Sequence, residues 1–222
     1  MDFKTTLLMS GFVTPDTRSF ILSRPDDFDW TPGYGVKLSF SDPEWDVPKG
    51  RPFTPTGMVD DKVLEFVIKR YTAHHGFTEK FHDLKPGKEI MMSKPFGTIE
   101  YKGKGTFIAA GAGITPFLAI FRDLDGKGEL KGNNLIYSNK TPADVICENE
   151  LRYYFGDRSI FTCTREQCYG YGDERVDFDF LKGEIANLDQ QFYVCGPPPF
   201  VKDVKGILAE LGADSAALIL ES

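Results

Sequence analysis

Two patterns of apolar and polar residues divide the chain. In residues 1–102, apolar residues alternate with polar ones over short runs, as Val36, Leu38 and Phe40 do, and this period of two predicts half-buried strands. Turn residues such as Pro, Gly and Asp separate the runs. Strands are predicted over residues 5–13, 18–24, 35–40, 63–71 and 89–93, and a short helical segment over residues 78–84. Many short strands with little helix favour a small antiparallel β-barrel.

The rest of the chain, residues 103–222, alternates short apolar runs with segments of helical spacing. This alternation predicts a parallel sheet with helices on its faces. We expect strands over residues 107–110, 135–137, 160–163, 192–195 and 217–220, and helices after residue 115, over 148–155, over 178–181 and from the prolines at 197–199 to Gly212. The sequence therefore predicts two domains, residues 1–102 and residues 103–222, joined near residues 102–105.

The segment TFIAAGAGITPFLAIF, residues 106–121, is the most informative stretch of the second half. An apolar strand runs into Gly111 and Gly113, which allow a tight turn and close approach of a ligand to the backbone. Thr115 is the expected N-cap of the next helix, and Pro116 its first residue. Backbone N–H groups at such a helix start bind anions, typically phosphates. An ordinary strand–turn–helix connection is the alternative, because GxGxTP is not the full dinucleotide-binding fingerprint.

Composition excludes several classes of function. A net charge of −7 argues against a nucleic-acid partner, and no apolar run approaches the roughly 18 residues of a membrane span. The N-terminus lacks a secretory signal, so we expect a cytoplasmic protein. The spacing of Cys147, Cys163, Cys168 and Cys195 fits neither a zinc site nor an iron–sulfur cluster. Cys147, Cys163 and Cys168 are expected to be reduced thiols without a shared ligand.

Two motifs in the first half carry candidate chemistry. Residues 51–55, RPFTP, place a permanent cation, an aromatic ring and a hydroxyl on an extended segment, so that Arg51 can pair with a phosphate, Phe53 can stack on a planar ring and Thr54 can hydrogen-bond a ring heteroatom. A purely structural role is the alternative for these residues.

Residues 74–78, HHGFT, precede the short helix, whose amides can face a second phosphate. A metal site at His74 and His75 is not expected, because adjacent side chains on a loop rarely converge on one ion.

Six motifs follow one another along the chain: RPFT, a glycine-containing loop before a short helix, KPFG, GAGITPF, YSNKT and CGPPPF. In this order they resemble the motifs of the ferredoxin–NADP⁺ reductase superfamily. The resemblance is strongest to its stand-alone flavodoxin-reductase-like members and covers essentially the whole chain. It implies an antiparallel β-barrel that binds FAD over residues 1–102, followed by an α/β parallel-sheet domain that binds NADP or NAD over residues 103–222.

The resemblance also implies roles for individual residues. The flavin would be held by two segments. The first is Arg51, Pro52, Phe53 and Thr54, with Arg51 on a phosphate, Phe53 against the ring and the Thr54 hydroxyl near flavin N5. The second is Gly76, Phe77 and Thr78, whose amides would hold the flavin phosphate. The nicotinamide nucleotide would lie against Gly111, Gly113 and Thr115, with Cys195 and Gly196 beside the reactive ring carbon. Thr164 and Arg165 resemble the segment that holds the 2′-phosphate of NADPH, which favours NADPH over NADH.

Two departures from the family pattern affect this interpretation. Several relatives end in an aromatic residue that stacks on the flavin, whereas this chain ends Leu220-Glu221-Ser222. Glu221 is then the terminal group expected near flavin N5, with an exposed tail as the alternative. Lys140 stands where an arginine is common, and it supplies a point charge in place of a planar fork.

The implied activity is that of a flavoprotein reductase. Hydride would pass from NAD(P)H to FAD, and electrons would then pass to an acceptor such as flavodoxin or ferredoxin, a small electron-carrier protein. A haem protein and free quinone are equally compatible with the sequence as acceptors. Such chemistry needs two rings held in contact with water excluded, and little acid–base catalysis by the protein. The alternatives are the reductase component of a two-component oxygenase and a non-catalytic flavin- or nucleotide-binding regulatory subunit.

Overall fold

A computed structural model describes residues 2–40, 50–72 and 76–220 of the chain. It divides into two compact units: Met1–Thr98 together with Thr115–Asp123, and Ile99–Ile114 together with Leu124–Ser222. The first change of unit, at residue 99, lies within a few residues of the boundary expected from the sequence. The domain limits themselves, residues 1–102 and 103–222, stay a prediction.

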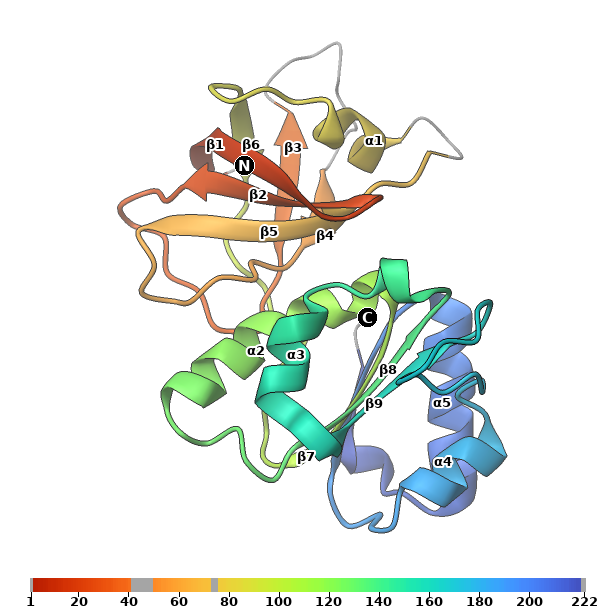
Figure 1. The fold of residues 1–222 in the computed structure, drawn as a ribbon. Helices are drawn as coiled ribbons and strands as arrows, with labels where there is room; N and C mark the ends of the chain where they lie inside the picture. Colours follow the sequence, from red (N-terminus) through yellow and green to blue (C-terminus); the bar gives the residue numbers. More distant parts are fainter. Residues whose placement is uncertain (1, 41–49, 73–75, 221–222) are drawn as a thin grey trace. The chain divides into compact units, whose positions relative to one another are not determined.

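The first unit is built on a six-stranded, barrel-like sheet, as predicted (Figure 1). Its strands have the order β4-β3-β6-β1-β2-β5, and every neighbouring pair is antiparallel. The elements of this part of the chain are β1 (Phe3–Thr14), β2 (Thr17–Ser23), β3 (Val36–Phe40), β4 (Arg51–Phe53), β5 (Val63–Lys69), α1 (Phe77–His82) and β6 (Glu89–Met92). Strand β4 is a new finding in this list, because its segment was expected only to be extended.

The hairpin of β1 and β2 is confirmed, and its turn is held by side chains. The Asp16 carboxylate accepts hydrogen bonds of 3.1 Å from the hydroxyls of both Thr14 and Thr17. The adjacent ion pair with Lys69, 2.9 Å long, ties the same carboxylate to β5. A fixed turn fixes the strand register, and register decides which side chains face the core.

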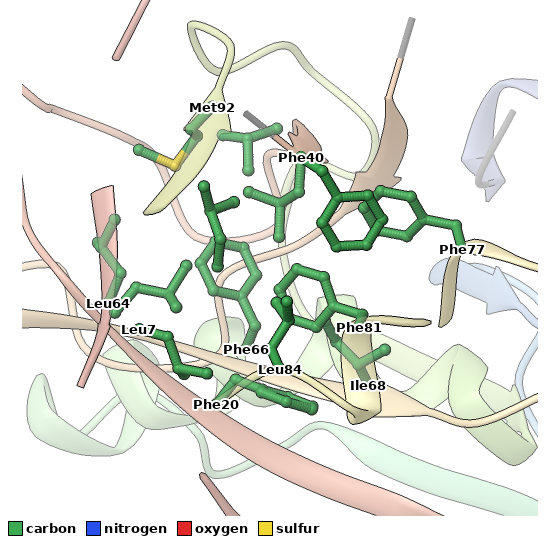
Figure 2. Close-up of a cluster of buried hydrophobic side chains, with 14 of the residues drawn as sticks. Leu7, Phe20, Phe40, Leu64, Phe66, Ile68, Phe77, Phe81, Leu84 and Met92 are labelled. Carbon is green, nitrogen blue, oxygen red and sulfur yellow. The ribbon is translucent and has the colours of Figure 1, made fainter. Parts of the chain in front are cut away.

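The core of this unit is buried and rich in aromatic side chains (Figure 2). Leu7, Phe20, Phe66 and Phe81 are each 0% exposed. Phe20 from β2 and Phe81 from α1 meet edge to face, with ring centroids 4.9 Å apart. Burying one such side chain contributes about 1.5–3 kcal/mol, so this cluster attaches the short helix α1 to the sheet.

The second unit contains a five-stranded parallel sheet with the order β11-β10-β7-β8-β9, which confirms the predicted fold class. Helix α3 packs on one face of the sheet, and α4 and α5 pack on the other (Figure 1). The elements from residue 105 onward are β7 (Gly105–Ala110), the 3₁₀ turn η2 (Gly111–Ile114), α2 (Thr115–Gly126), β8 (Asn134–Asn139), α3 (Glu148–Phe155), β9 (Ser159–Cys163), α4 (Phe178–Glu184), β10 (Gln191–Cys195), α5 (Pro198–Leu211) and β11 (Leu218–Leu220).

Two helix boundaries differ from the prediction. Thr115 was expected to cap α2, but the 3₁₀ turn runs directly into the helix, and Thr115 is its first residue. The helix expected over residues 178–181 continues to Glu184. It starts after Asp177, whose side chain caps it by accepting a 3.0 Å hydrogen bond from the Phe180 N–H. Helix α5 begins with Pro198 and ends at Gly212, whose φ of +102° is the left-handed geometry that favours glycine.

Candidate functional site

Within the first unit, the structure brings together two segments that were expected to bind the flavin. Phe53 ends β4, and its ring stacks on the ring of Phe77 in α1, with centroids 5.7 Å apart and planes 30° apart. Phe77 is 5% exposed and also lies 4.6 Å from Phe40. The side chain of Phe77 therefore belongs to the core, and only its backbone can serve a ligand.

Strand β4 carries a cation and an aromatic ring on one of its faces. It pairs with β3, so that Arg51 lies opposite Leu38 and Phe53 lies opposite Val36. Since alternate strand residues share a face, the exposed Arg51 and the half-buried Phe53 lie on the same side of the strand. Thr54, which follows directly, is 6% exposed. The motif thus combines an accessible cation, a partly accessible ring and a buried hydroxyl.

The start of α1 is built without a side-chain cap. Gly76 occupies the cap position and its residue type provides no capping group. The Thr78 hydroxyl instead accepts a 3.2 Å hydrogen bond from the Tyr71 N–H and closes the preceding loop. In the predicted phosphate site, Gly76, Phe77 and Thr78 can therefore contribute backbone amides, while the Thr78 hydroxyl has a structural partner.

The histidine pair considered as a metal site, His74 and His75, lies outside the described residues. His82 is buried, and its Nε2 donates a 2.8 Å hydrogen bond to the carbonyl of Ile68. Burial lowers the pKa of His82, which keeps the ring neutral at physiological pH. Within residues 2–40, 50–72 and 76–220, no group of three or more His, Cys, Asp or Glu side chains is arranged to hold a metal ion.

In the second unit, the carboxyl ends of β7 and β10 are neighbours at the centre of the parallel sheet. The chain leaves β7 towards β8 on one side, and it later returns to β10 on the other side. Ligands of open α/β sheets bind at the point where the strand order reverses in this way. The glycine turn after β7 and the residues Cys195 and Gly196 both lie at this point.

The glycine turn touches the end of β10. A methyl group on Gly113 would lie 2.3 Å from the Cys195 carbonyl oxygen and 2.6 Å from the Gly196 nitrogen. Gly196 is equally confined, since a methyl group there would lie 2.9 Å from the Phe200 ring and 3.1 Å from Ala110. Glycine at 113 was expected to make room for a ligand. In the structure the missing side chain also makes room for the neighbouring strand, and the expected role towards a ligand stays a prediction.

The first glycine of the turn is held by a buried tyrosine. Gly111 has a φ of +53°, which a side chain would strain. Its carbonyl accepts a 2.9 Å hydrogen bond from the Tyr137 hydroxyl, and that hydroxyl accepts a 3.3 Å hydrogen bond from the Ile146 N–H. Tyr137 is 0% exposed, and burial raises its pKa far above the usual value, so the hydroxyl stays protonated and keeps donating.

Two other predicted nucleotide residues lie on the same edge of the sheet. The Thr164 N–H, directly after β9, donates a 3.0 Å hydrogen bond to the Asn139 carbonyl at the end of β8. The Arg165 N–H continues the pairing with a 2.9 Å hydrogen bond to the Lys140 carbonyl. Both side chains are exposed. Strands β10 and β9 are three steps apart in the sheet, about 14–15 Å at the usual strand spacing.

The remaining candidates, two catalytic and one cofactor-binding, differ in what the structure says of them. Cys195 ends β10, pairs in register with Ala109 and is 1% exposed. Thr115 is half-buried at the start of α2. Glu221 lies outside the described residues. The roles of all these residues stay predictions.

Comparisons with known proteins agree with this geometry. Residues 107–206 match the family of oxidoreductase NAD-binding domains. The chain is 28% identical over 211 residues to the NADH-cytochrome b5 reductase 2-B of Vanderwaltozyma polyspora, covering 86% of this chain and 69% of that protein.

Two solved structures share the fold over nearly the whole chain. A ferredoxin NADP⁺ reductase from Neisseria gonorrhoeae with bound FAD and NADP has a TM-score of 0.85 at 20% identity, covering 99% of this chain and 97% of that one. The CS-b5R domains of human Ncb5or, in the NAD⁺ form, have a TM-score of 0.85 at 23% identity, covering 99% of this chain and 69% of that one.

These matches agree with the resemblance to the ferredoxin–NADP⁺ reductase superfamily that the sequence motifs indicate. They also support the enzyme class expected from the sequence, NAD(P)H-dependent flavin oxidoreductases. No helix within the described ranges is long and apolar enough to cross a membrane.

Sequence reasoning missed the residue that shapes the glycine turn. Tyr137 was noted only as part of a short apolar strand and of the YSNKT motif. Its hydroxyl reaches Gly111, 26 residues away in the chain. A signal was present, because a tyrosine in a strand expected to be fully buried needs a hydrogen-bond partner for its hydroxyl. The identity of that partner depends on strand order, which the local pattern does not contain.

Proposed function

We propose that this chain is a flavoprotein reductase that takes hydride from NAD(P)H onto bound FAD and delivers electrons to a small electron-carrier protein. The observation that carries the proposal is the contact of the Gly113 turn with Cys195 and Gly196 at the reversal point of the parallel sheet. That contact brings the backbone of residues 111–114 against the backbone of Cys195 and Gly196, and we call this arrangement the cradle. It lies at the edge of the sheet where nucleotides bind in this class of fold.

The first unit fits a flavin. Arg51 is exposed beside the half-buried ring of Phe53, and the start of α1 beside Phe53 has no side-chain cap. A cation, a ring face and helix N–H groups are the groups that bind a phosphate and a flat heterocycle. Bound FAD supplies the hydride-accepting ring, while the protein contributes orientation and exclusion of water. Thr54, buried next to Phe53, is placed in our proposal to donate its hydroxyl to the flavin ring.

We propose NADPH as the preferred donor, because Arg165 and Thr164 lie exposed on the same edge as the glycine turn. A guanidinium pairs well with a phosphate monoester. NADH is the competing donor, since the yeast relative is named for NADH.

Flavodoxin or ferredoxin was expected as the acceptor. The matching yeast proteins are named cytochrome b5 reductases. We therefore propose a cytochrome b5-type haem protein as an acceptor alongside flavodoxin and ferredoxin.

The proposal includes a cytoplasmic location, which the presence of all four cysteines as thiols supports. The reductase component of a two-component oxygenase remains the alternative enzyme. A regulatory flavin-binding subunit remains the alternative without catalysis.

Anaerobic reduction tests the proposed function. The purified protein is expected to be yellow and to bleach within seconds when mixed with NADPH, more slowly with NADH. The reduced protein is then mixed with flavodoxin, ferredoxin or cytochrome b5, and oxidation of the flavin is followed by absorbance. Yellow protein that neither nucleotide bleaches would contradict the enzyme and favour the regulatory subunit.

A further inference from the structure

Thr56, two residues after Thr54, is held at all three of its polar groups. Its N–H donates a 2.8 Å hydrogen bond to the Glu65 carbonyl, and its hydroxyl donates one of 3.0 Å to Glu65 Oε2. Its carbonyl accepts a 2.6 Å hydrogen bond from Arg122 Nη1. Thr56 is 0% exposed. The backbone that follows Thr54 is therefore fixed in one place.

The groups that hold Thr56 also hold each other. Arg122 Nη1 lies 2.5 Å from Glu65 Oε2, and the two side chains are only 17% and 22% exposed. The other carboxylate oxygen, Glu65 Oε1, accepts a 2.8 Å hydrogen bond from the Ser19 hydroxyl on β2. Burial alone would raise the pKa of Glu65, but Arg122 and the hydroxyl donors hold it below its usual value. Glu65 thus stays charged and keeps Arg122 in place.

Arg122 comes from α2, in the part of this helix that belongs to the first unit. Ala119, one turn earlier on the same side of the helix, is 1% exposed and lies in the core cluster of that unit. The helix is therefore anchored in the first unit by an apolar contact at Ala119. Since that contact already attaches α2, the charged pair has to be explained separately.

Stability does not explain the pair. A buried ion pair can usually be exchanged for apolar side chains of similar volume at no cost in stability, because desolvation offsets the attraction between the charges. What an apolar pair cannot supply is a hydrogen bond of defined direction to a backbone carbonyl. The structure directs this bond at Thr56, in the short segment that begins with Thr54.

We propose that Arg122 is a positioning residue of the reductase: held by Glu65, its guanidinium fixes the backbone of residues 54–56 and thereby the place of the Thr54 hydroxyl. This inference rests on the proposed function. It assigns to Arg122 no contact with substrate or flavin.

The test compares Arg122→Met with Arg122→Lys, which keeps a charged donor. Lys69→Met is the matched control, because Lys69 lies on the same strand as Glu65 and forms a half-buried ion pair with Asp16. The first readout is amide hydrogen exchange of Thr54, Thr56 and Gly57 in the flavin-free protein. The second is the rate constant of flavin reduction at saturating NADPH, measured anaerobically in the flavin-loaded protein.

For Arg122→Met, exchange at these amides should rise at least tenfold and the reduction rate constant should fall at least tenfold. The lysine variant should lie between it and the wild type. Lys69→Met should change neither quantity. Wild-type exchange and a wild-type rate constant in folded Arg122→Met would overturn the proposal.

A second variant covers the case in which Arg122→Met does not fold. Arg122→Met combined with Glu65→Leu removes both charges together, which avoids leaving the carboxylate buried alone. The proposal requires fast exchange and slow reduction in this double variant as well, and wild-type values would overturn it. Wild-type protein that NADPH and NADH both fail to bleach would instead contradict the proposed function, whatever the exchange experiment shows.

Discussion

Gly113 and the carbonyl of Cys195 touch: a methyl group on residue 113 would lie 2.3 Å from that oxygen. We expect Gly113→Ala to push the glycine turn away from β10, because neither backbone can yield as a flexible side chain would. The variant should have a lower unfolding temperature and at least tenfold weaker NADPH binding, measured by calorimetry. Gly206→Ala is the control, since a methyl group in that part of α5 meets nothing within 4 Å and alanine favours a helix. A variant at 113 with wild-type affinity would contradict the cradle.

Tyr137→Phe tests the hydrogen bonds beneath the turn. Loss of the hydroxyl leaves the Gly111 carbonyl and the Ile146 N–H without this partner in the interior. The expected cost is about 1–3 kcal/mol of unfolding free energy, measured by urea denaturation. Tyr153→Phe, at a side chain 82% exposed, should change it by less than about 0.5 kcal/mol. Equal stability of the two variants would show that the turn does not depend on Tyr137.

Arg51→Ala tests the proposed flavin phosphate site. A hydrogen bond between charged groups contributes about 1.5–3 kcal/mol, so the dissociation constant for FAD should rise by roughly 10- to 150-fold. Fluorescence titration of the flavin-free protein measures this constant. Lys62→Ala, which removes a charge elsewhere on the unit, serves as the control. Unchanged FAD affinity in Arg51→Ala would place the flavin phosphate elsewhere.

Arg165→Ala tests the choice of nicotinamide nucleotide. Without the guanidinium, KM for NADPH should rise at least tenfold, while KM for NADH, which has no 2′-phosphate, should change less than twofold. Steady-state reduction of ferricyanide gives both constants. Arg175→Ala, at another exposed arginine, is expected to change neither. A parallel loss with both nucleotides would contradict a role in specificity.

The stability of the protein should depend on pH through Glu65. Its pKa in the folded protein lies below the usual value of 4.5, so its contribution is fully present above that value and disappears as pH falls through the folded-state pKa. Glu65→Gln should therefore destabilise the protein by about 1.5–3 kcal/mol at pH 7 and by progressively less in acid. Chemical denaturation from pH 7 to pH 3 measures the difference, with Glu129→Gln, at an exposed glutamate, as the control. A gap between Glu65→Gln and wild type that does not vary with pH would contradict this.

The periodicity of the sequence was enough for the elements and the two sheet types. Alternation in Val36, Leu38 and Phe40 became β3, and the apolar run before Gly111 became the central parallel strand β7. Such patterns report local geometry and burial, which are properties of neighbours in the chain.

Contacts between distant residues were beyond the same reasoning. The network of Thr56, Glu65 and Arg122 joins residues up to 66 positions apart. It requires knowing that α2 packs with the strands of the first half of the chain, although it follows a strand of the second half. The contact of Gly113 with Cys195 was likewise not foreseen, because the two residues become neighbours only through strand order.

The prolines at the start of α5 have a consequence for how a ligand is oriented. Pro197, Pro198 and Pro199 are consecutive, and none of them has a backbone N–H. The start of that helix is thus poor in donors for a negative charge, whereas the turn after β7 contains no proline between Gly111 and Thr115. We expect this unequal supply of donors to draw the charged middle of a dinucleotide towards the turn after β7 and to leave the side next to α5 for its dihydronicotinamide ring, which carries no charge.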